Sequence, residues 1–238
     1  MITEHSRTPV SILPHVRERV IARRGRPHVF DRMDPARTAV AVIDLQVHFM
    51  APGFPGELAE ARDIVPAVNA LVHGAREMGA TIVWVTTEAR RTREIWPLYA
   101  TELLTEAQAA ARERSLEGDG APLWPGLHAA SGDLRVTKTM FSAFAPRSSR
   151  LPEVLSERGC DTLLIAGAAT NTCCEATARD AAMANLRTTM VSDALAARSE
   201  EEHVGSLSNF YASFGDVQTV AEALAFLAAE PVVEAIRA

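Results

Sequence analysis

The chain has 238 residues, of which 47% are hydrophobic and 23% are charged, and this composition suits one compact domain. The net charge of -6 argues against a nucleic-acid partner, and three cysteines are too few for a disulfide framework and fit a reducing cytoplasm. Residues 1–7 lack the apolar core of a signal peptide, and no apolar run approaches the roughly 20 residues of a membrane span. We therefore expect a cytoplasmic protein with no membrane partner.

An arm over residues 1–34 opens the chain and is rich in Arg, Pro and His. Its segment 14–24 has the spacing of a short helix that is basic on most faces. Two interpretations fit this segment: a solvated arm, or an arm that docks on a neighbouring subunit. We expect the domain proper to occupy residues 35–238.

Apolar runs and helical spacing alternate through this domain. The apolar runs predict strands over residues 38–43, 81–86, 134–137, 162–166, 188–191 and, at an edge, 216–219. Helical spacing predicts helices over residues 61–78, 98–114, 151–158, 175–185, 201–214 and 220–229. The alternation indicates an α/β fold, a three-layer α/β/α sandwich with a mostly parallel, doubly wound sheet.

Three reactive side chains lie where predicted strands end. Asp44 follows the first strand, Lys138 follows the third, and Cys173 follows a small-residue turn after the fourth. Ligands bind beyond the carboxyl ends of the strands in such sheets, so we expect the three side chains to share one site. Each also has a plainer interpretation: a helix cap for Asp44, a solvated strand end for Lys138, and a packed small side chain for the cysteine.

These residue types permit nucleophilic attack on a carbonyl carbon. A thiol at a helix N-terminus has a lowered pKa, which favours the thiolate of Cys173. Asp44 could take the thiol proton and pass it to a leaving amine, while Lys138 balances the charge. Backbone N–H groups at the turn could bind the oxyanion. His48 and His128 are alternative bases in a Cys–His arrangement, although a surface or supporting role suits them better.

Three motifs carry these residues in order. They read A-V-A-V-I-D-L-Q-x-x-F over residues 39–49, V-T-K-x-x-F-S-A-F over 136–144, and G-A-A-T-N-T-C-C-E-A-T-A-R-D-A over 167–181. Together, across about residues 36–225, they resemble the isochorismatase-like cysteine hydrolases, a superfamily that includes nicotinamidase and N-carbamoylsarcosine amidohydrolase. Cys173 begins the C-x-x-x-T-A-R-D pattern, so we expect its neighbour Cys174 to be a packing residue.

The resemblance implies a catalytic triad of Asp44, Lys138 and Cys173. It also implies a cis peptide bond between Ala168 and Ala169, with the N–H groups of Ala169 and Cys173 forming the oxyanion hole. Members of the superfamily form dimers or tetramers, so the resemblance implies a homodimer or homotetramer.

The substrate class is indicated by two further segments. Metal-binding nicotinamidases carry an Asp and histidines near the second strand, whereas residues 88–91 here read E-A-R-R, so we expect neither a metal nor another cofactor. Residues 209–217, N-F-Y-A-S-F-G-D-V, resemble ureidoacrylate amidohydrolase and its N-carbamoyl amide relatives.

The favoured function is hydrolysis of a C–N bond in a small amide or ureido compound through a Cys173 thioester, with release of ammonia or carbamate. The alternatives are an isochorismatase-type vinyl-ether hydrolase that uses Asp44 as general acid, and a non-catalytic binding protein.

Residues in the loops near the strand ends are candidates for substrate binding. An arginine after the second strand could pair with a substrate carboxylate, and aromatic side chains could wall the pocket. A solvated basic loop and plain packing are the competing interpretations. The candidates are Gln46, Phe49, Arg90, Arg91, Phe141 and Phe144.

Overall fold

The computed structural model describes residues 12–229. The expected absence of a signal peptide at residues 1–7 lies outside the described residues, as do the first part of the arm and the last part of the domain.

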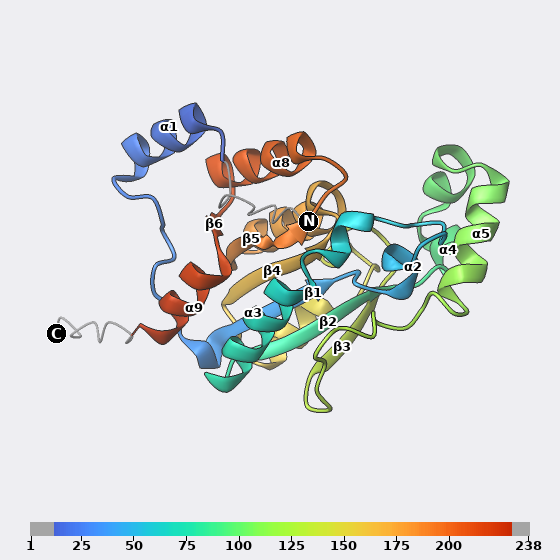
Figure 1. The fold of residues 1–238 in the computed structure, drawn as a ribbon, viewed down its shortest axis with the longest axis horizontal. Helices are drawn as coiled ribbons and strands as arrows, with labels where there is room; N and C mark the ends of the chain where they lie inside the picture. The colour runs from blue at the N-terminus through green and yellow to red at the C-terminus, as the bar shows by residue number, and fades with distance from the viewer. Residues whose placement is uncertain (1–11, 230–238) are drawn as a thin grey trace, which may run out of the picture.

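A six-stranded parallel sheet forms the middle layer of the molecule (Figure 1). Its strands are β1 (Thr38–Ile43), β2 (Thr81–Thr87), β3 (Leu134–Lys138), β4 (Thr162–Ala168), β5 (Arg187–Ala196) and β6 (Asp216–Gln218). They lie in the order β3-β2-β1-β4-β5-β6, and every neighbouring pair is parallel. All residues of the central strands β1 and β4 are buried, which explains their unbroken apolar sequences. The predicted α/β fold is confirmed, with a sheet that is parallel throughout rather than mostly parallel.

Helices cover both faces of the sheet. The longer helices are α1 (Pro14–Arg24), α3 (Val65–Glu77), α5 (Glu106–Leu116), α6 (Leu151–Glu157), α7 (Glu175–Met183), α8 (Glu200–Ser213) and α9 (Val220–Ala228). The short ones are α2 (Val47–Met50), α4 (Thr92–Ile95), the 3-10 turns η1 (Pro35–Arg37) and η2 (Ala59–Arg62), and the π turns η3 (Tyr99–Leu103) and η4 (Thr170–Cys174).

Side chains alternate between two hydrophobic cores along each strand. In β1, Val40 and Val42 share a core with α3 and α9, whereas Ala41 and Ile43 share one with α6, α7 and α8. This alternation produces the three layers that the sequence predicted.

Two predicted helices are each divided in the structure. The segment 61–78 contains η2 and then α3, whose first turn holds Pro66, a residue that fits there because the first turn needs no N–H bond. The segment 98–114 contains η3 and then α5. Thr105 and Gln108 form a capping box at the start of α5, which ends the preceding turn and begins a new helix.

The described part of the arm packs on α8 of its own chain. Val16 and Val20 of α1 are buried in the core shared with α8. Arg24 donates hydrogen bonds to the carbonyls of Tyr211 (2.9 Å) and Gly215 (3.2 Å), at the C-terminal end of α8 where carbonyls lack helical partners. The basic character of α1 therefore serves this docking.

A buried carboxylate, Asp216, holds the segment that joins the arm to the domain. Its oxygens accept hydrogen bonds from the N–H groups of Val29 (3.0 Å) and Phe30 (3.2 Å) and lie 3.1 Å from Nδ1 of His28. Nε2 of His28 lies 3.6 Å from Glu222 on α9. The hydrogen bond to Asp216 raises the pKa of His28 above 6.5, against the effects of burial and of Arg17.

Replacing His28 by alanine is expected to lower the free energy of unfolding by about 1 kcal/mol in a pH-dependent manner. Because the folded-state pKa is raised, the stabilisation is fully present below the unfolded pKa near 6.5 and is lost as the pH rises through the folded pKa. Urea unfolding measured at several pH values should show this trend. His73, an exposed histidine 3.6 Å from Glu77 on α3, is the matched control, and a His73→Ala variant with the same pH trend would contradict the assignment.

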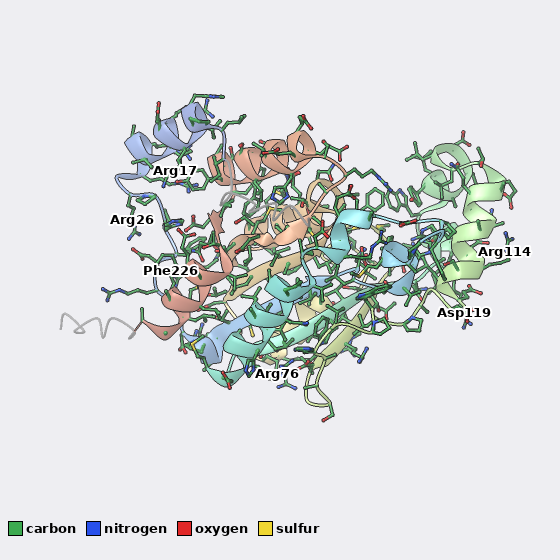
Figure 2. The ribbon with its side chains drawn as sticks, in the orientation of Figure 1. Arg17, Arg26, Arg76, Arg114, Asp119 and Phe226 are labelled. Carbon is green, nitrogen blue, oxygen red and sulfur yellow. The ribbon has the colours of Figure 1, made fainter. Side chains whose placement is uncertain are left out.

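The parallel strands bring their carboxyl ends to one edge of the sheet. Helices α4 and α5, inserted between β2 and β3, lie beyond this edge (Figure 1). Figure 2 places Arg17 and Arg26 of the arm at the opposite end of the molecule from Arg114 and Asp119, which mark the insertion. The arm is therefore remote from the edge where a ligand would bind.

Candidate active site

Asp44 is placed by an unusual backbone conformation directly after β1. Its φ is +58°, in the left-handed region, while its N–H still bonds to the carbonyl of Val85 at 2.9 Å. Asp tolerates this region better than most residues, but the conformation is uncommon and is typical of functional sites. The turn leaves Asp44 buried, with 1% of the residue exposed, at the carboxyl edge of the sheet.

Gly167 in β4 allows the backbone of β1 to come close at this point. Its φ is +116°, and a Cβ atom there would lie 2.1 Å from the carbonyl oxygen of Ile43, the residue before Asp44. A side chain at position 167 would therefore displace the segment that carries Asp44.

We expect Gly167→Ala to lower the free energy of unfolding by at least about 2 kcal/mol, because it combines a strained φ with a backbone clash. Chemical denaturation measures the change. Gly205, within α8, is the matched control because a Cβ atom there meets nothing within 4 Å. Gly205→Ala should leave stability unchanged or raise it, and equal losses in both variants would show that the clash is not the cause.

Asp44, Lys138 and Cys173 converge on one point. Nζ of Lys138, the last residue of β3, lies 2.8 Å from Oδ2 of Asp44 and 3.4 Å from Sγ of Cys173 in η4. The ammonium also donates to Oγ1 of Thr87 at 2.7 Å and to the carbonyl of Met140 at 3.2 Å. All three side chains are buried, so the charges interact in a medium that screens them weakly.

The electrostatics differ from the expectation of a low-pKa thiol. Burial and the Asp44 charge raise the pKa of Cys173 to about 12, despite the opposing effect of Lys138. Burial is the largest single effect on Lys138 and lowers its pKa, but the interactions with Asp44 and Cys173 together outweigh burial, and the net pKa is raised. The resting site is therefore a neutral thiol beside the Asp44–Lys138 pair. The prediction of a lowered thiol pKa is wrong because burial and the Asp44 charge outweigh the lowering effect of Lys138.

Thr87, at the end of β2, is a site residue that the sequence reasoning missed. Its hydroxyl donates to Oδ1 of Asp44 at 2.7 Å and accepts from Lys138. Gln46 in turn holds Thr87: its Oε1 accepts from the Thr87 N–H at 2.6 Å, and its Nε2 donates to the Thr87 carbonyl at 3.2 Å. Gln46 is 1% exposed and does not line the cavity, so its position is that of a support and not of a substrate contact. The sequence does hold a signal for Thr87, because this residue directly follows the strand predicted over residues 81–86 and so lies at the same edge of the sheet as Asp44.

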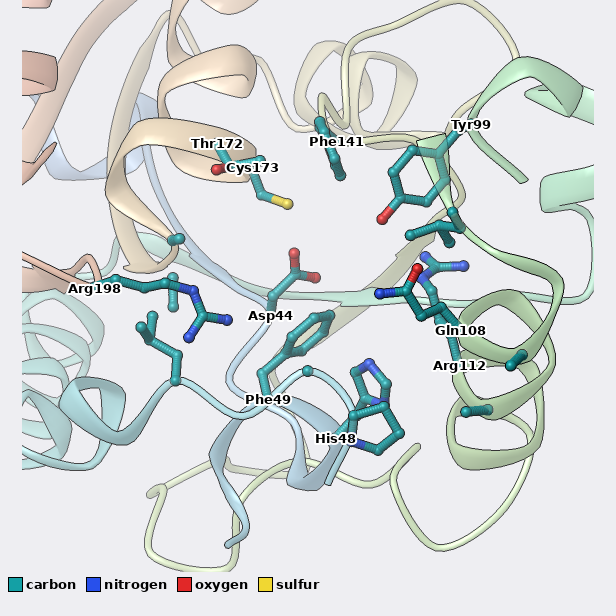
Figure 3. Close-up of a pocket in the computed structure, with 18 residues that line it drawn as sticks. Asp44, His48, Phe49, Tyr99, Gln108, Arg112, Phe141, Thr172, Cys173 and Arg198 are labelled. Carbon is teal, nitrogen blue, oxygen red and sulfur yellow. The ribbon is translucent and has the colours of Figure 1, made fainter. Parts of the chain in front are cut away.

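A cavity of about 580 Å³ opens at these residues. Figure 3 shows the Cys173 sulfur and the Asp44 carboxylate pointing toward each other at its centre. The cavity is lined by Phe49 and Phe141, both of which were predicted as pocket walls. It is also lined by Tyr99, Gln108 and Arg112 of the inserted segment and by Arg198 after β5. The wall beside Cys173 consists of Ala168, Ala169 and Thr172. The sequence reasoning missed the four residues Tyr99, Gln108, Arg112 and Arg198.

Besides Gln46, three more of the predicted substrate-binding residues lie outside the cavity. Arg90 and Arg91 are exposed, and Arg91 lies 3.8 Å from Glu94. The chain turns into α4 at the buried Thr92, which directs both arginines to the surface. Phe144 packs against the hydrophobic core instead of the cavity. The arginines that line the cavity are Arg112 and Arg198.

The two histidines occupy different surroundings. His48 lines the cavity, with Nδ1 2.8 Å from Oγ of Ser115 on α5, and burial together with the nearby Arg112 lowers its pKa to about 4. His48 is therefore neutral at pH 7. His128 is exposed and does not line the cavity.

The turn around Cys173 has the backbone that the resemblance implied. The peptide bond between Ala168 and Ala169 is cis, and Ala169 lines the cavity together with Cys173. Cys174 is fully buried, does not line the cavity, and has its Sγ 4.0 Å from the carbonyl of Ala166. The two adjacent thiols thus face different surroundings.

Within residues 12–229, no three His, Cys, Asp or Glu side chains are grouped so as to hold a metal ion. The expectation of a metal-free site stays a prediction. Among the helices of the same range, none is both long enough and apolar enough to span a bilayer.

Comparison with known proteins identifies the family. The model of the isochorismatase domain matches residues 38–222, which is most of the chain and includes all three motifs. The chain belongs to the isochorismatase family. The resemblance to isochorismatase-like cysteine hydrolases is therefore confirmed.

Three relatives illustrate the breadth of this isochorismatase family. A probable inactive nicotinamidase of Arabidopsis thaliana is 31% identical over 71% of this chain and 86% of its own. A ureidoacrylate amidohydrolase of Caulobacter vibrioides is 29% identical over 80% of this chain and 91% of its own. The crystal structure of a cysteine hydrolase from Pseudomonas syringae pv. phaseolicola has a TM-score of 0.70 and 26% identity, covering 82% of this chain and 94% of that one.

Proposed function

We propose that the protein is a cysteine-dependent amidohydrolase that cleaves a C–N bond in a small amide or ureido compound. The observation that carries the proposal is the convergence of Asp44, Lys138 and Cys173 beside a cavity large enough for a small molecule, with Asp44 and Cys173 in its lining. A buried carboxylate beside a buried thiol supplies a base and a nucleophile within reach of each other.

In the first half-reaction, Sγ of Cys173 forms a bond to the carbonyl carbon while its proton passes to Asp44. The raised pKa of the thiol means that attack and proton transfer occur together, instead of starting from a preformed thiolate. The proton then moves from Asp44 to the substrate nitrogen, the C–N bond breaks, and ammonia leaves. An acyl group remains on sulfur as a thioester.

In the second half-reaction, water attacks the thioester and gives a proton to Asp44, which returns it to the departing Sγ. Lys138 stays protonated throughout, because its raised pKa keeps the ammonium charged beside Asp44. The N–H groups of Ala169 and Cys173 are the proposed donors to the tetrahedral oxyanion in both steps. With a ureido substrate, the same sequence releases ammonia and leaves a carbamate.

The relatives support this reaction class without determining it. The ureidoacrylate amidohydrolase supports amide cleavage, whereas the relative described as a probable inactive nicotinamidase means that membership of the family alone does not establish activity. The cytoplasmic location and the homodimer or homotetramer that the sequence suggested are part of the proposal.

The test is ammonia release from a panel of ureido acids, monoamides of dicarboxylic acids, and nicotinamide. We expect ammonia from at least one ureido acid or monoamide. Hydrolysis of a vinyl ether such as isochorismate, with no ammonia from any amide, would instead favour Asp44 acting as a general acid without the thiol.

A further inference from the structure

Helix α5 brings a set of polar side chains to the wall of the cavity that faces Cys173. Gln108 and Arg112 lie one turn apart on the same face of α5, and both line the cavity. Tyr99 lies beside them, and Figure 3 shows its hydroxyl and the Gln108 amide pointing toward the centre of the cavity. None of these three residues takes part in the Asp44–Lys138–Cys173 arrangement.

The capping box fixes which end of the Gln108 amide faces the cavity. Its Oε1 accepts hydrogen bonds from the backbone N–H of Thr105 at 2.9 Å and from the Thr105 hydroxyl at 3.1 Å. The backbone N–H can only donate, so the atom that it meets must be the oxygen, and the NH₂ group is directed away from the cap. Gln108 therefore offers the cavity hydrogen-bond donors.

The guanidinium of Arg112 is held in place before any ligand arrives. It donates to Oγ1 of Thr92 at 3.1 Å, and its centre lies 5.6 Å from the Tyr99 ring. Thr92 is buried, which anchors this contact. Such preorganisation reduces the entropy lost when Arg112 binds a partner.

The charges around the cavity favour an anionic ligand. Asp44 is the one acidic side chain among the lining residues of the described chain, and it is paired with Lys138. His48, near Arg112, is neutral at pH 7. The α5 wall thus presents a cation and amide donors with no opposing carboxylate, a combination that suits a carboxylate group, which only accepts hydrogen bonds.

We infer that Arg112 and Gln108 bind a carboxylate at the end of the substrate remote from the scissile C–N bond. The inference rests on the proposed function, and it narrows the substrate class to amides or ureido compounds that carry a distal carboxylate. Arg112 acts here as a specificity-determining residue and takes no part in the chemical step.

The experiment compares monoamides of succinic, glutaric and adipic acid with their methyl esters, in which the carboxylate charge is removed. Wild type should hydrolyse at least one acid with kcat/KM about 30-fold above that of its ester. Arg112→Gln should remove this preference, mainly by raising KM for the acid. Circular dichroism with urea denaturation shows whether the variant keeps its fold.

Two variants serve as comparisons. Arg114, two residues along α5, does not line the cavity, and Arg114→Gln should retain the preference for acids. Arg198, which has no hydrogen bond or ion pair with another described residue, is the competing carboxylate site. If Arg198→Gln abolishes the preference while Arg112→Gln retains it, or if wild type hydrolyses acids and esters equally, the inference is wrong.

Calorimetric titration of Cys173→Ala with the same acids and esters separates this inference from the proposed function. The carboxylate site is supported if Cys173→Ala binds an acid but not its ester and if adding Arg112→Gln abolishes that binding. This result would stand even if wild type hydrolyses no amide, and only the proposed function would then fail. Equal binding of acid and ester, or no binding of any acid, overturns the inference.

Discussion

Replacing Cys173 by alanine is expected to abolish turnover, lowering kcat by about 10⁴-fold or more, while the protein still folds. The substitution removes the atom that would bond to the carbonyl carbon, and no other thiol lines the cavity in residues 12–229. Stability should change little, because alanine leaves the buried Asp44–Lys138 pair intact. Ammonia release measures the activity, and circular dichroism with chemical denaturation measures the fold.

Cys174 provides the matched control, since it is the adjacent residue in the chain and also a buried thiol. Cys174→Val should retain most of the activity, because valine keeps an apolar side chain in the core that Cys174 occupies. If Cys174→Val were inactive and Cys173→Ala active, the nucleophile would be assigned to the wrong sulfur. Activity that survives Cys173→Ala but is lost in Asp44→Asn would indicate vinyl-ether chemistry.

Lys138→Met is expected to lower the free energy of unfolding by about 3–5 kcal/mol and also to abolish activity. Lys138 is 1% exposed, and its ammonium is 2.8 Å from the Asp44 carboxylate. Removing the ammonium leaves a buried negative charge with the Thr87 hydroxyl as its remaining neighbour among the contacts described above. Urea denaturation measures the loss of stability.

The double variant Asp44→Asn with Lys138→Met separates stability from catalysis. It removes both charges at once, so it should recover much of the stability lost in Lys138→Met while remaining inactive. A Lys138→Met variant as stable as wild type would show that Asp44 is not a buried carboxylate in the resting protein.

The fold and the centre of the site could be predicted because both follow from local patterns. Buried parallel strands have unbroken apolar sequences, as in β1 and β4, and the carboxyl ends of such strands lie together at one edge. The positions of Asp44 and Lys138 relative to their strands therefore placed them at the site. The turn after β4 did the same for Cys173.

The walls of the cavity could not be predicted, because they depend on how the insertion between β2 and β3 folds back over the sheet edge. The cavity-facing residues of α5 include Gln108 and Arg112, and on sequence alone they resemble a solvated helical face. Arg90 and Arg91 lie nearer to a strand end in sequence, yet the turn into α4 exposes them. The thiol pKa was wrongly predicted for a related reason, since burial depends on distant segments.

The central claim is that a covalent bond forms between the substrate acyl group and Cys173. Acid quenching during turnover with a saturating amide substrate, followed by peptide mass spectrometry, tests it most directly. We predict that the peptide containing Cys173 and Cys174 gains the mass of the acyl group and that fragmentation places it on Cys173. Sustained ammonia release with no acyl group on either thiol, or with the acyl group on Cys174, would contradict this account.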